Sequence, residues 1–310
     1  MTDLTALNTL ESRLNGSMKL IRMAPMAKYT TLRLGGPADL LAEPATPEQL
    51  VQLLKAAHEL HIPVTLMGHG SNLLVKDGGI RGLVIRICRE MRRIEVQGDT
   101  LRAEAGAMLS SLAMTAAENS LGGLTFASGI PGTVGGGVYM NAGAYGGEMS
   151  QVVTLVEGVD LTGEAFAYTG EEMQFAYRRS RLMDENKIVT HVTCRLPRAD
   201  REALIKEMVE LNRRRAEKQP LTLPSAGSTF KRPVGGYASA LVDECGLRGA
   251  SIGGAQVSEK HAGFLVNKGG TAADFLALIA HVQQVVMEQK GIMLEPEVRI
   301  LGEDAPVTPV

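Results

Sequence analysis

The chain has no tryptophan, and its aromatic residues amount to only 4% of 310 residues. Proteins that hold single-stranded nucleic acid stack its bases on aromatic side chains and neutralise its phosphates with basic stretches. Here the formal net charge is −2 at pH 7, and the densest basic patch is Arg213-Arg214-Arg215. Consecutive residues of a helix point in different directions, so we expect these arginines to lie on a solvated face. The composition argues against nucleic acid as a partner.

Cysteine is also scarce, and long apolar runs are absent. Cys88, Cys194 and Cys245 are widely spaced and form no CxxC pair. We expect buried free thiols in a reducing compartment rather than a zinc site. No apolar run approaches the length that crosses a bilayer, and the first residues lack the apolar core of a signal peptide. These absences predict a cytoplasmic protein with no membrane partner.

Glycine, by contrast, is abundant. It accounts for 35 of the 310 residues, or about 11%, whereas an average protein contains roughly 7% glycine. The glycines cluster at 68–82, 122–147 and 226–270. Clustered glycine is typical of tight turns and of places where the backbone approaches a ligand closely. The length suits two or three domains with cores of their own.

The first part of the chain predicts a βαβ-like unit. Thr46 can cap a helix, Pro47 suits its first position, and Gln49 completes a capping box. The run 64–67 predicts a buried strand that leads into a glycine loop, and 83–87 predicts another strand. The helix between them has an apolar stripe at Leu50, Leu53, Leu54, Ala57 and Leu60.

The rest of the chain mixes short strands and helices. The strands predicted in its middle part are 94–96, 101–104, 155–159, 166–168 and 189–196, with a helix near 108–119. A charged helix over 201–217 ends at Gln219–Pro224, which is the best candidate for a domain boundary. Beyond it we predict a helix near 237–246, strands near 263–267 and a long helix from Thr271 to Gly291. The ends, including Pro306–Val310, are expected to be flexible tails.

The first glycine loop, 68–73, directly follows a predicted strand. Gly68 and Gly70 permit positive φ, and Ser71 and Asn72 add side-chain donors, so the loop can form an anion-binding nest. It is not a GxGxxG fingerprint, because Leu73 stands where the third glycine would be. Taken alone, an ordinary strand-to-loop turn is the simpler interpretation.

The second glycine-rich stretch, 128–136, has four glycines around Pro131 and is followed by Asn141-Ala142-Gly143-Ala144. Such a surface has few side chains, so it can lie flat against an aromatic ring or a pyrophosphate. Two glycine-rich loops after a βαβ-like unit favour a large nucleotide cofactor.

Polar candidates for chemistry come later. Arg178 and Arg179 follow Tyr177, and Ser228 follows Gly227. No Gly-x-Ser-x-Gly elbow surrounds Ser228, so an acyl-enzyme nucleophile is not expected. Glu295 and Glu297 flank Pro296 on a predicted strand, where residues two apart share a face, and the pattern does not choose between them. Considered singly, surface ion pairing and turn capping explain these residues.

The combination of motifs is far more specific than any one of them. The set comprises Gly-x-Gly-Ser-Asn-Leu-Leu, Ser-Gly-Ile-Pro-Gly-x-Val-Gly-Gly, Asn-Ala-Gly-Ala-Tyr-Gly, Tyr-Arg-x-Ser, Gly-Ser-x-Phe-Lys and Leu-Glu-Pro-Glu-Val-Arg. In this order, from about Tyr29 to Gly302, they closely resemble the UDP-N-acetylenolpyruvoylglucosamine reductases. The resemblance implies a bacterial FAD enzyme that uses NADPH to convert UDP-N-acetylglucosamine enolpyruvate to UDP-N-acetylmuramate in peptidoglycan synthesis.

The resemblance also implies an α+β fold and a division of labour along the chain. A two-part FAD-binding region of the vanillyl-alcohol-oxidase type would occupy 1–85 and 86–200, followed by a substrate domain at 201–310. The cofactor-binding residues expected are Gly68, Gly70, Ser71, Asn72, Leu73, Gly129, Ile130, Pro131, Gly132, Val134, Gly135, Gly136, Asn141, Ala142 and Gly143. No metal is expected.

By the same resemblance, three residues carry the chemistry. Arg178 stabilises negative charge that spreads into the substrate carboxylate after hydride transfer, Ser228 donates the proton, and Glu297 assists as the acid of Glu-Pro-Glu. The substrate-binding residues expected are Lys218, on the UDP diphosphate, with Lys231, Arg232 and Tyr237. The chain resembles the shorter branch of the family, because Tyr177 to Val189 leaves no room for an inserted substrate loop.

Two other functions fit the glycine loops. A flavoprotein oxidase would share the FAD fold and could tether its flavin through His69, the histidine within the first glycine loop. A non-enzymatic nucleotide-binding protein would leave Arg178, Ser228 and Glu297 without a common purpose. A visible spectrum with flavin bands separates the flavoproteins from the last alternative.

Overall fold

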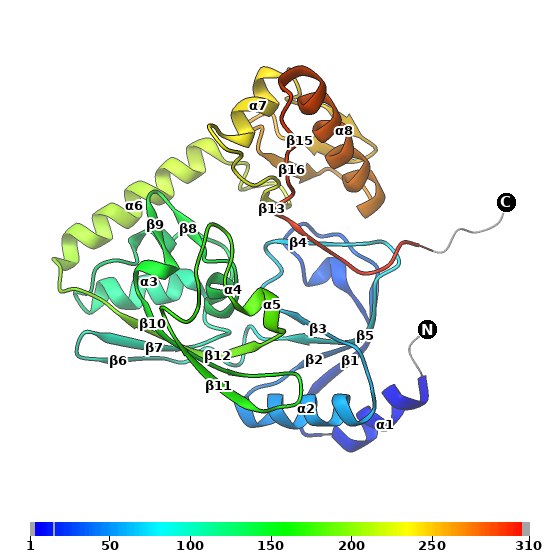
Figure 1. The fold of residues 1–310 in the computed structure, drawn as a ribbon, viewed down its shortest axis with the longest axis vertical. Coiled ribbons are helices and arrows are strands. Elements are labelled where there is room, and N and C mark those ends of the chain that lie inside the picture. The colour runs from blue at the N-terminus through cyan, green and yellow to red at the C-terminus, as the bar shows by residue number, and fades with distance from the viewer. Residues whose placement is uncertain (1–3, 15, 306–310) are drawn as a thin grey trace. The chain divides into compact units, whose positions relative to one another are not determined.

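The structure is a computed structural model that describes residues 4–14 and 16–305 (Figure 1). The expected tail Pro306–Val310 and the first three residues lie outside this range. The chain divides into two compact units. Unit 1 comprises residues 1–21, 40–69 and 82–215, and unit 2 comprises residues 22–39, 70–81 and 216–310. The functional division at residues 85 and 200 stays a prediction.

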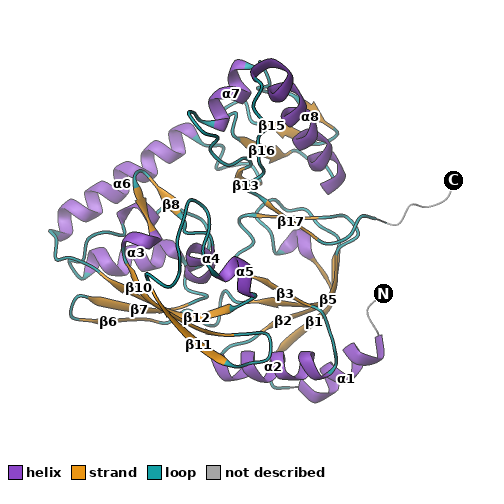
Figure 2. Cartoon of the chain, in the orientation of Figure 1, coloured by secondary structure: helices purple, strands orange, loops and turns teal. Residues whose placement is uncertain are grey.

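Helices and strands are mixed throughout, which confirms the α+β class (Figure 2). A four-stranded sheet has the order β1-β2-β5-β3. Its strands are β1 (Lys19–Pro25), β2 (Pro37–Glu43), β3 (Val64–Met67) and β5 (Ile80–Arg86). β3 is parallel to β5 and is reached from β2 through α2 (Pro47–Glu59), as the βαβ-like pattern predicts. α1 (Leu4–Leu14) packs beside α2 (Figure 1).

The prediction of a buried strand at 64–67 is wrong in one respect. β3 is an edge strand of its sheet, and within it Met67 alone is buried, whereas Leu66 is 37% exposed. The strand is rich in apolar residues, but an edge strand has a neighbouring strand on one side only, so most of its side chains stay partly exposed.

The start of α2 differs from the expected capping box. Thr46 accepts a hydrogen bond from the Gln49 N–H at 3.3 Å, as predicted. The Gln49 side chain, however, accepts from the Ala45 N–H and donates to the Ser17 carbonyl, both at 2.7 Å. The reciprocal half of the box is therefore wrong, because the glutamine reaches past the cap to the turn between α1 and β1.

In unit 1, a five-stranded antiparallel sheet has the order β11-β10-β12-β7-β6. Its strands are β6 (Ile94–Gln97), β7 (Thr100–Glu104), β10 (Val153–Val159), β11 (Ala165–Thr169) and β12 (Ile188–Arg195). α4 (Val134–Tyr139) packs on β12 and β7, and α3 (Leu109–Glu118) packs on α4. One buried hydrophobic core connects this sheet with α1 and α2.

Several short elements complete this part of the chain before the long helix α6 (Arg201–Lys218). They are η2 (Thr125–Ala127), β8 (Gly143–Ala144), β9 (Gly147–Glu148), η3 (Met149–Gln151) and α5 (Leu182–Glu185). The expected solvated face of α6 is correct for Arg213 and Arg214, which are exposed and pair with Glu210 at 2.8 and 2.7 Å. It is wrong for Arg215, which is half-buried, and this burial lowers the pKa of its guanidinium.

Unit 2 has a second hydrophobic core, between two helices and an antiparallel sheet of order β13-β16-β15-β14 (Figure 2). The strands are β13 (Ser225–Ser228), β14 (Ser251–Ile252), β15 (Ala255–Val257) and β16 (Phe264–Asn267). The helices are α7 (Ala238–Glu244) and α8 (Ala272–Lys290), and a 3-10 turn, η1 (Met26–Lys28), precedes them in the sequence. A parallel pair, β4 (Leu73–Val75) with β17 (Arg299–Leu301), completes the unit.

Helix α8 begins and ends where the sequence predicts. Thr271 and Asp274 form a reciprocal capping box, and Gly291 ends the helix at φ 68°. Asp77, beyond β4, adds a cap that the sequence did not reveal: its two carboxylate oxygens accept from the Ala272 and Ala273 N–H groups, both at 2.9 Å. The negative charge also lies favourably at the positive end of the helix dipole.

Cys88 and Cys194 are buried, as predicted, and Cys245 is half-buried. Burial raises the pKa of the Cys194 thiol to about 12, which leaves it unreactive at neutral pH. No helix within residues 4–14 and 16–305 has the length and apolar character needed to cross a membrane.

Candidate active site

In unit 2, Ser228 and Glu297 lie on two segments that are hydrogen-bonded to each other. Ser228 ends β13, and the carbonyl of the next residue, Thr229, accepts from the Glu297 N–H at 2.7 Å. An antiparallel bridge pairs Phe230 with Pro296. The fold thus joins the Gly-Ser-x-Phe-Lys and Glu-Pro-Glu motifs, which are far apart in the sequence. Ser228 is exposed and Glu297 is half-buried.

The structure separates the two carboxylates that the pattern left equivalent. The expected regular strand across Glu295–Glu297 is wrong, because pairing there is confined to the bridge at Pro296, which has no N–H to donate. The Glu295 carboxylate is 71% exposed and pairs with the Lys231 Nζ at 2.9 Å. Glu297 is the less exposed of the two and is held through its main chain, so their surroundings differ.

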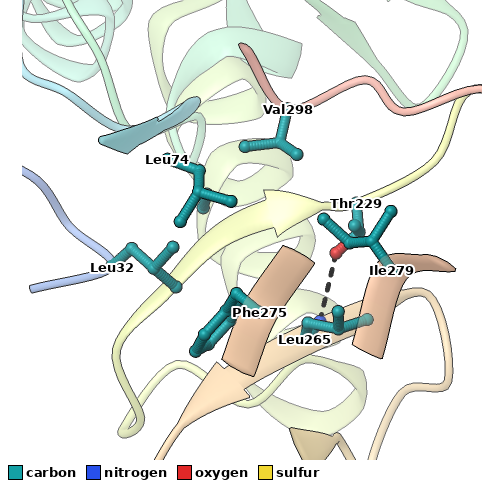
Figure 3. Close-up of a pocket in the computed structure, with 8 residues that line it drawn as sticks. Leu32, Leu74, Thr229, Leu265, Phe275, Ile279 and Val298 are labelled. Atoms are coloured by element: carbon teal, nitrogen blue, oxygen red, sulfur yellow. Dashed lines mark hydrogen bonds between the residues drawn. The ribbon is translucent and has the colours of Figure 1, made fainter. Parts of the chain in front are cut away.

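The segments that carry Ser228 and Glu297 rest on a packed apolar floor. Figure 3 shows Thr229 and Val298 among the eight residues around a cavity of about 10 Å³, with Phe275 and Ile279 of α8 beneath. Thr229 is 5% exposed, and its hydroxyl accepts a hydrogen bond from the Leu265 N–H at 3.2 Å. A volume of this size is close to that of a single water, so the floor is not itself a ligand site.

A cleft of about 400 Å³ opens in unit 2 at the end of α6. Two of the predicted substrate-binding residues, Lys218 and Tyr237, line it. The other lining residues are Glu217, Ser239, Ala240, Asp243, Arg248, Lys260, His261 and Ala262. This volume lies within the range of pockets that bind small molecules. Its cations make it suited to an anionic ligand.

The charges of the cleft act on His261. Burial lowers the pKa of this imidazole, and the positive charges of Arg248 and Lys218 lower it further. Its Nδ1 accepts from the Gly263 N–H at 3.1 Å, so the neutral ring carries its proton on Nε2. Arg248 is braced by a bidentate pair with Asp243, and Lys260 donates to the Ala216 carbonyl at 2.6 Å. The cleft is therefore an electropositive site with a neutral histidine donor.

The two remaining substrate candidates lie between β13 and α7. Lys231 pairs with Glu295, as described above, and the Arg232 guanidinium lies over the Tyr237 ring at 4.6 Å from its centroid. Tyr237 is 60% exposed, which leaves its ring open to a ligand in the cleft that it lines. Cation–π stacking of this kind fixes the orientation of both side chains.

In unit 1, Arg178 is fastened to the segment that follows α4. It lies at the corner of a tight turn closed by Ala176 and Arg179, and its φ of 52° is unusual for a residue other than glycine. Its guanidinium donates to the Gly143 carbonyl at 2.9 Å and to the Asn141 carbonyl at 3.4 Å. The strained backbone and the two bonds aim this side chain in a fixed direction.

Two predicted motifs meet at this turn. Asn141 is fully buried, donates to the Ala176 carbonyl at 3.1 Å and accepts from the Ser150 N–H at 3.0 Å. Ser180, also buried, donates to the Tyr139 carbonyl at 2.7 Å. The Asn-Ala-Gly-Ala and Tyr-Arg-x-Ser motifs are therefore one local structure. Arg179 instead forms the expected surface pair, with Asp184 at 2.7 Å.

The first glycine loop behaves only partly as predicted. Gly70 has φ 74°, but Gly68 has no positive φ: it is needed because a Cβ there would lie 2.4 Å from the Thr133 hydroxyl. The Asn72 side chain donates to the Glu297 carbonyl at 3.1 Å. The Nδ1 of His69 lies 3.9 Å from the Cys88 sulfur. Burial lowers the pKa of His69.

The second stretch is not a loop throughout. Val134 begins α4, with Thr133 as its cap. The Val134 and Gly135 N–H groups donate to Ala107 and Ala105 at 2.7 and 2.9 Å, and the Gly136 N–H donates to the Thr133 hydroxyl. A Cβ on Gly135 would lie 2.9 Å from that of Ala105. Here glycine serves close packing of α4, so any cofactor contact must use atoms other than these N–H groups.

Comparison with known proteins now decides the family. Residues 38–168 match an FAD binding domain, and residues 219–301 match the C-terminal domain of UDP-N-acetylenolpyruvoylglucosamine reductase. A reductase of that name from Levilactobacillus brevis is 49% identical over 289 residues, covering 93% of this chain and 95% of the relative. The chain belongs to the UDP-N-acetylenolpyruvoylglucosamine reductase family.

Other members of the reductase family are similar to this chain over nearly the same length. The Clostridium botulinum (strain Hall) protein is 48% identical over 290 residues, which cover 93% of this chain and 94% of the relative. The crystal structure of the Thermus caldophilus reductase superposes with a TM-score of 0.79 at 36% identity, over 92% of this chain and 99% of that one. The expected resemblance and the expected fold, an FAD-binding region followed by a C-terminal domain, are confirmed.

Several residues that line the cleft or lie against a glycine-rich stretch belong to no motif that the sequence revealed. Arg248, Lys260 and His261 line the cleft, yet no motif singled them out. A signal was present, because Lys260-His261 is a polar pair just before the apolar run of β16. Arg215 was also missed: a Cβ on Gly129 would lie 2.7 Å from its Nη1, so its guanidinium lies against the second glycine stretch.

Proposed function

We propose that this protein reduces UDP-N-acetylglucosamine enolpyruvate to UDP-N-acetylmuramate, a step of peptidoglycan precursor and cell wall synthesis, as an FAD enzyme that uses NADPH. Its membership of the reductase family over 93% of its length supports this function. The observation that carries the proposal is the hydrogen bond between the Thr229 carbonyl and the Glu297 N–H. It joins the segment of the hydroxyl, Ser228, to the segment of the carboxyl, Glu297, in the matched C-terminal domain.

The residues of the FAD-binding region suit that cofactor. The left-handed backbone of Gly70 and the φ of 140° at Gly132 support close approach of main chain to a phosphate. We propose that the main chain around Gly68–Leu73 and Asn141–Gly143 holds FAD, together with atoms of Gly129–Gly136 other than the N–H groups that are bonded within the protein. When bound, FAD supplies the hydride that the alkene of the substrate accepts.

Three side chains of this protein are proposed to stabilise the negative charge that forms on the substrate and to supply its proton. Hydride addition to the terminal alkene carbon leaves negative charge on the adjacent carbon, and this charge spreads into the substrate carboxylate. Arg178, aimed by its bonds to Asn141 and Gly143, stabilises that charge. Ser228 donates its hydroxyl proton to the carbon, and Glu297 supplies a further polar partner for the intermediate.

We assign the electropositive cleft of unit 2 to the nucleotide end of the substrate. Lys218 and Lys260 supply positive charge for a diphosphate, beside the Arg248–Asp243 pair and Glu217, and Tyr237 offers an exposed ring. Lys231 and Arg232, between β13 and α7, are proposed to bind substrate as well. Cytoplasmic location is also a proposal, supported by the buried thiols of Cys88 and Cys194.

A test separates the two halves of the reaction. Ser228→Ala should purify with FAD and should be reduced by NADPH at the parental rate, because no proton is needed at a substrate carbon in that half. Reoxidation of the reduced enzyme by the enolpyruvyl substrate should slow by roughly 10²–10⁴-fold, the usual range for loss of a general acid.

The matched control is Ser225→Ala, three residues earlier on the same strand. It should leave both half-reactions at parental rates in stopped-flow absorbance. If Ser228→Ala slowed both halves equally, the serine would be structural. If the purified parent protein showed no flavin bands, the proposed function itself would be wrong.

A further inference from the structure

The main chain of Glu297 is held from one side by β13. Its N–H donates to the Thr229 carbonyl at 2.7 Å. Thr229 has two further hydrogen bonds: its N–H donates to the Gly263 carbonyl at 2.8 Å, and its hydroxyl accepts from the Leu265 N–H at 3.2 Å (Figure 3). This side of Glu297 is therefore tied to the core of unit 2, directly beside Ser228.

The other side of Glu297 is held by the first glycine loop. The Asn72 Nδ2 donates to the Glu297 carbonyl at 3.1 Å, and the Asn72 carbonyl accepts from the Arg299 N–H at 3.0 Å. The parallel pairing of β4 with β17 starts only at Leu73 and Arg299. Both peptide groups around the Glu297 Cα are thus hydrogen-bonded. The group before it donates to Thr229, and the group after it accepts from Asn72 and also donates to Thr229 through the Val298 N–H, at the longer distance of 3.4 Å.

The Asn72 amide fills a gap between two regions of pairing. Before Glu297 there is the single bridge at Pro296, and after it β17 begins at Arg299, so no ladder spans the acid itself. An asparagine amide supplies a neutral N–H donor at that gap, whereas an aspartate of the same shape would present only acceptors to the carbonyl. The residue type at position 72 matters for this bond.

We infer that Asn72 is a positioning residue for Glu297: its side chain sets the place of the acid and ties that place to the loop proposed to hold FAD. The inference rests on the proposed function, in which Glu297 assists reduction of the substrate. Loss of the bond should therefore slow the substrate half of the reaction far more than the NADPH half. A misplacement of about 1 Å can cost roughly 10²-fold in rate.

The test uses the full-length holoenzyme and the isosteric variant Asn72→Asp, with Asn72→Ser as a smaller second variant. Because the main chain of this loop is proposed to hold FAD, both variants should still bind it, and Asn72→Ser, which adds no charge to the loop, should keep NADPH-dependent reduction close to the parent. Reoxidation by the enolpyruvyl substrate should slow by about 10- to 100-fold. Asn119→Asp is the control, because that side chain also donates to a main-chain carbonyl, of Thr115 at 2.8 Å, in α3. It should leave reoxidation unchanged.

A double variant distinguishes positioning from a general structural effect. If Asn72 acts through Glu297, adding Asn72→Asp to Glu297→Gln should slow reoxidation little beyond Glu297→Gln alone. Multiplying effects would overturn the inference. So would loss of FAD in both Asn72 variants, which would assign the side chain to the cofactor instead. If Glu297→Gln alone left reoxidation at the parental rate, the proposed role of the acid would fail, and the inference with it.

Discussion

Replacing Glu297 by glutamine should nearly abolish reduction of the substrate, whereas the same change at Glu295 should have a small effect. Glutamine keeps the size of the side chain and one hydrogen-bond donor but removes the proton that titrates. Glu297 is half-buried and clamped at both its N–H and its carbonyl, so the change alters a fixed polar group beside Ser228. Glu295 instead extends into solvent.

The expected sizes follow from these surroundings. Loss of one preorganised partner of a developing oxyanion costs about 10²–10³ in rate. The Lys231–Glu295 pair has side chains 41% and 71% exposed, and an exposed pair of this kind contributes about 1 kcal/mol at most. If all of that were lost from the transition state, the rate would fall only about fivefold. The two variants should thus differ by at least about 20-fold.

Single-turnover reoxidation of the reduced enzyme by the enolpyruvyl substrate measures this difference directly. FAD content and the NADPH-dependent half-reaction are followed in the same preparations and should match the parent in both variants. A larger effect of Glu295→Gln would show that the acid is the first carboxylate of Glu-Pro-Glu. Equal effects would show that the whole turn, rather than one carboxyl, is required.

Two further predictions concern the cofactor loop and pH. Gly70→Val should lose FAD, because Gly70 has φ 74° in the proposed cradle. The control, Gly98→Val, puts a similar backbone strain at φ 63°, with no atom within 4 Å of the new Cβ, and should keep FAD. Equal absorbance of bound flavin in the two purified variants would refute the cradle. Burial lowers the pKa of His69, His191 and His261, so the unfolded chain takes up protons near 6.5 that the folded chain does not. The free energy of unfolding should therefore fall as pH drops from about 7.5 to 5.5, His191→Gln should flatten the decline, and urea titrations that show no slope would contradict it.

Local signals predicted the elements of the fold well. The stripe of α8 and its caps at Thr271 and Gly291 follow from spacing and from residue type alone. The Asp77 cap did not, because it reaches the first turn of α8 from a distant turn. The same distinction explains Gln49, whose side chain was expected to close a local box but binds Ser17 instead. Periodicity reports neighbours along the chain and leaves tertiary partners open.

The candidate site was predictable as a set of motifs, but not as an arrangement. No pattern indicated that Asn141 would brace the turn that carries Arg178, or that Thr229 would hold Glu297. The choice between Glu295 and Glu297 was left open because a strand was expected there. Pro296 interrupts pairing and allows the two carboxylates different surroundings. Arg248 and Lys260 escaped notice because isolated cations on a surface are common and carry no motif.

A glycine or an amide in a ligand-binding motif can serve the protein rather than the ligand. Gly68 leaves room for the Thr133 hydroxyl, and Gly135 lets α4 approach Ala105, so both are explained without a cofactor. Gly70 differs, because its left-handed backbone, at φ 74°, itself favours glycine. Asn72 resembles Gly68 and Gly135 in this respect, because its side-chain amide donates to the Glu297 carbonyl within the protein. The Gly-x-Gly-Ser-Asn motif of this reductase thus also contacts the segment that carries Glu297.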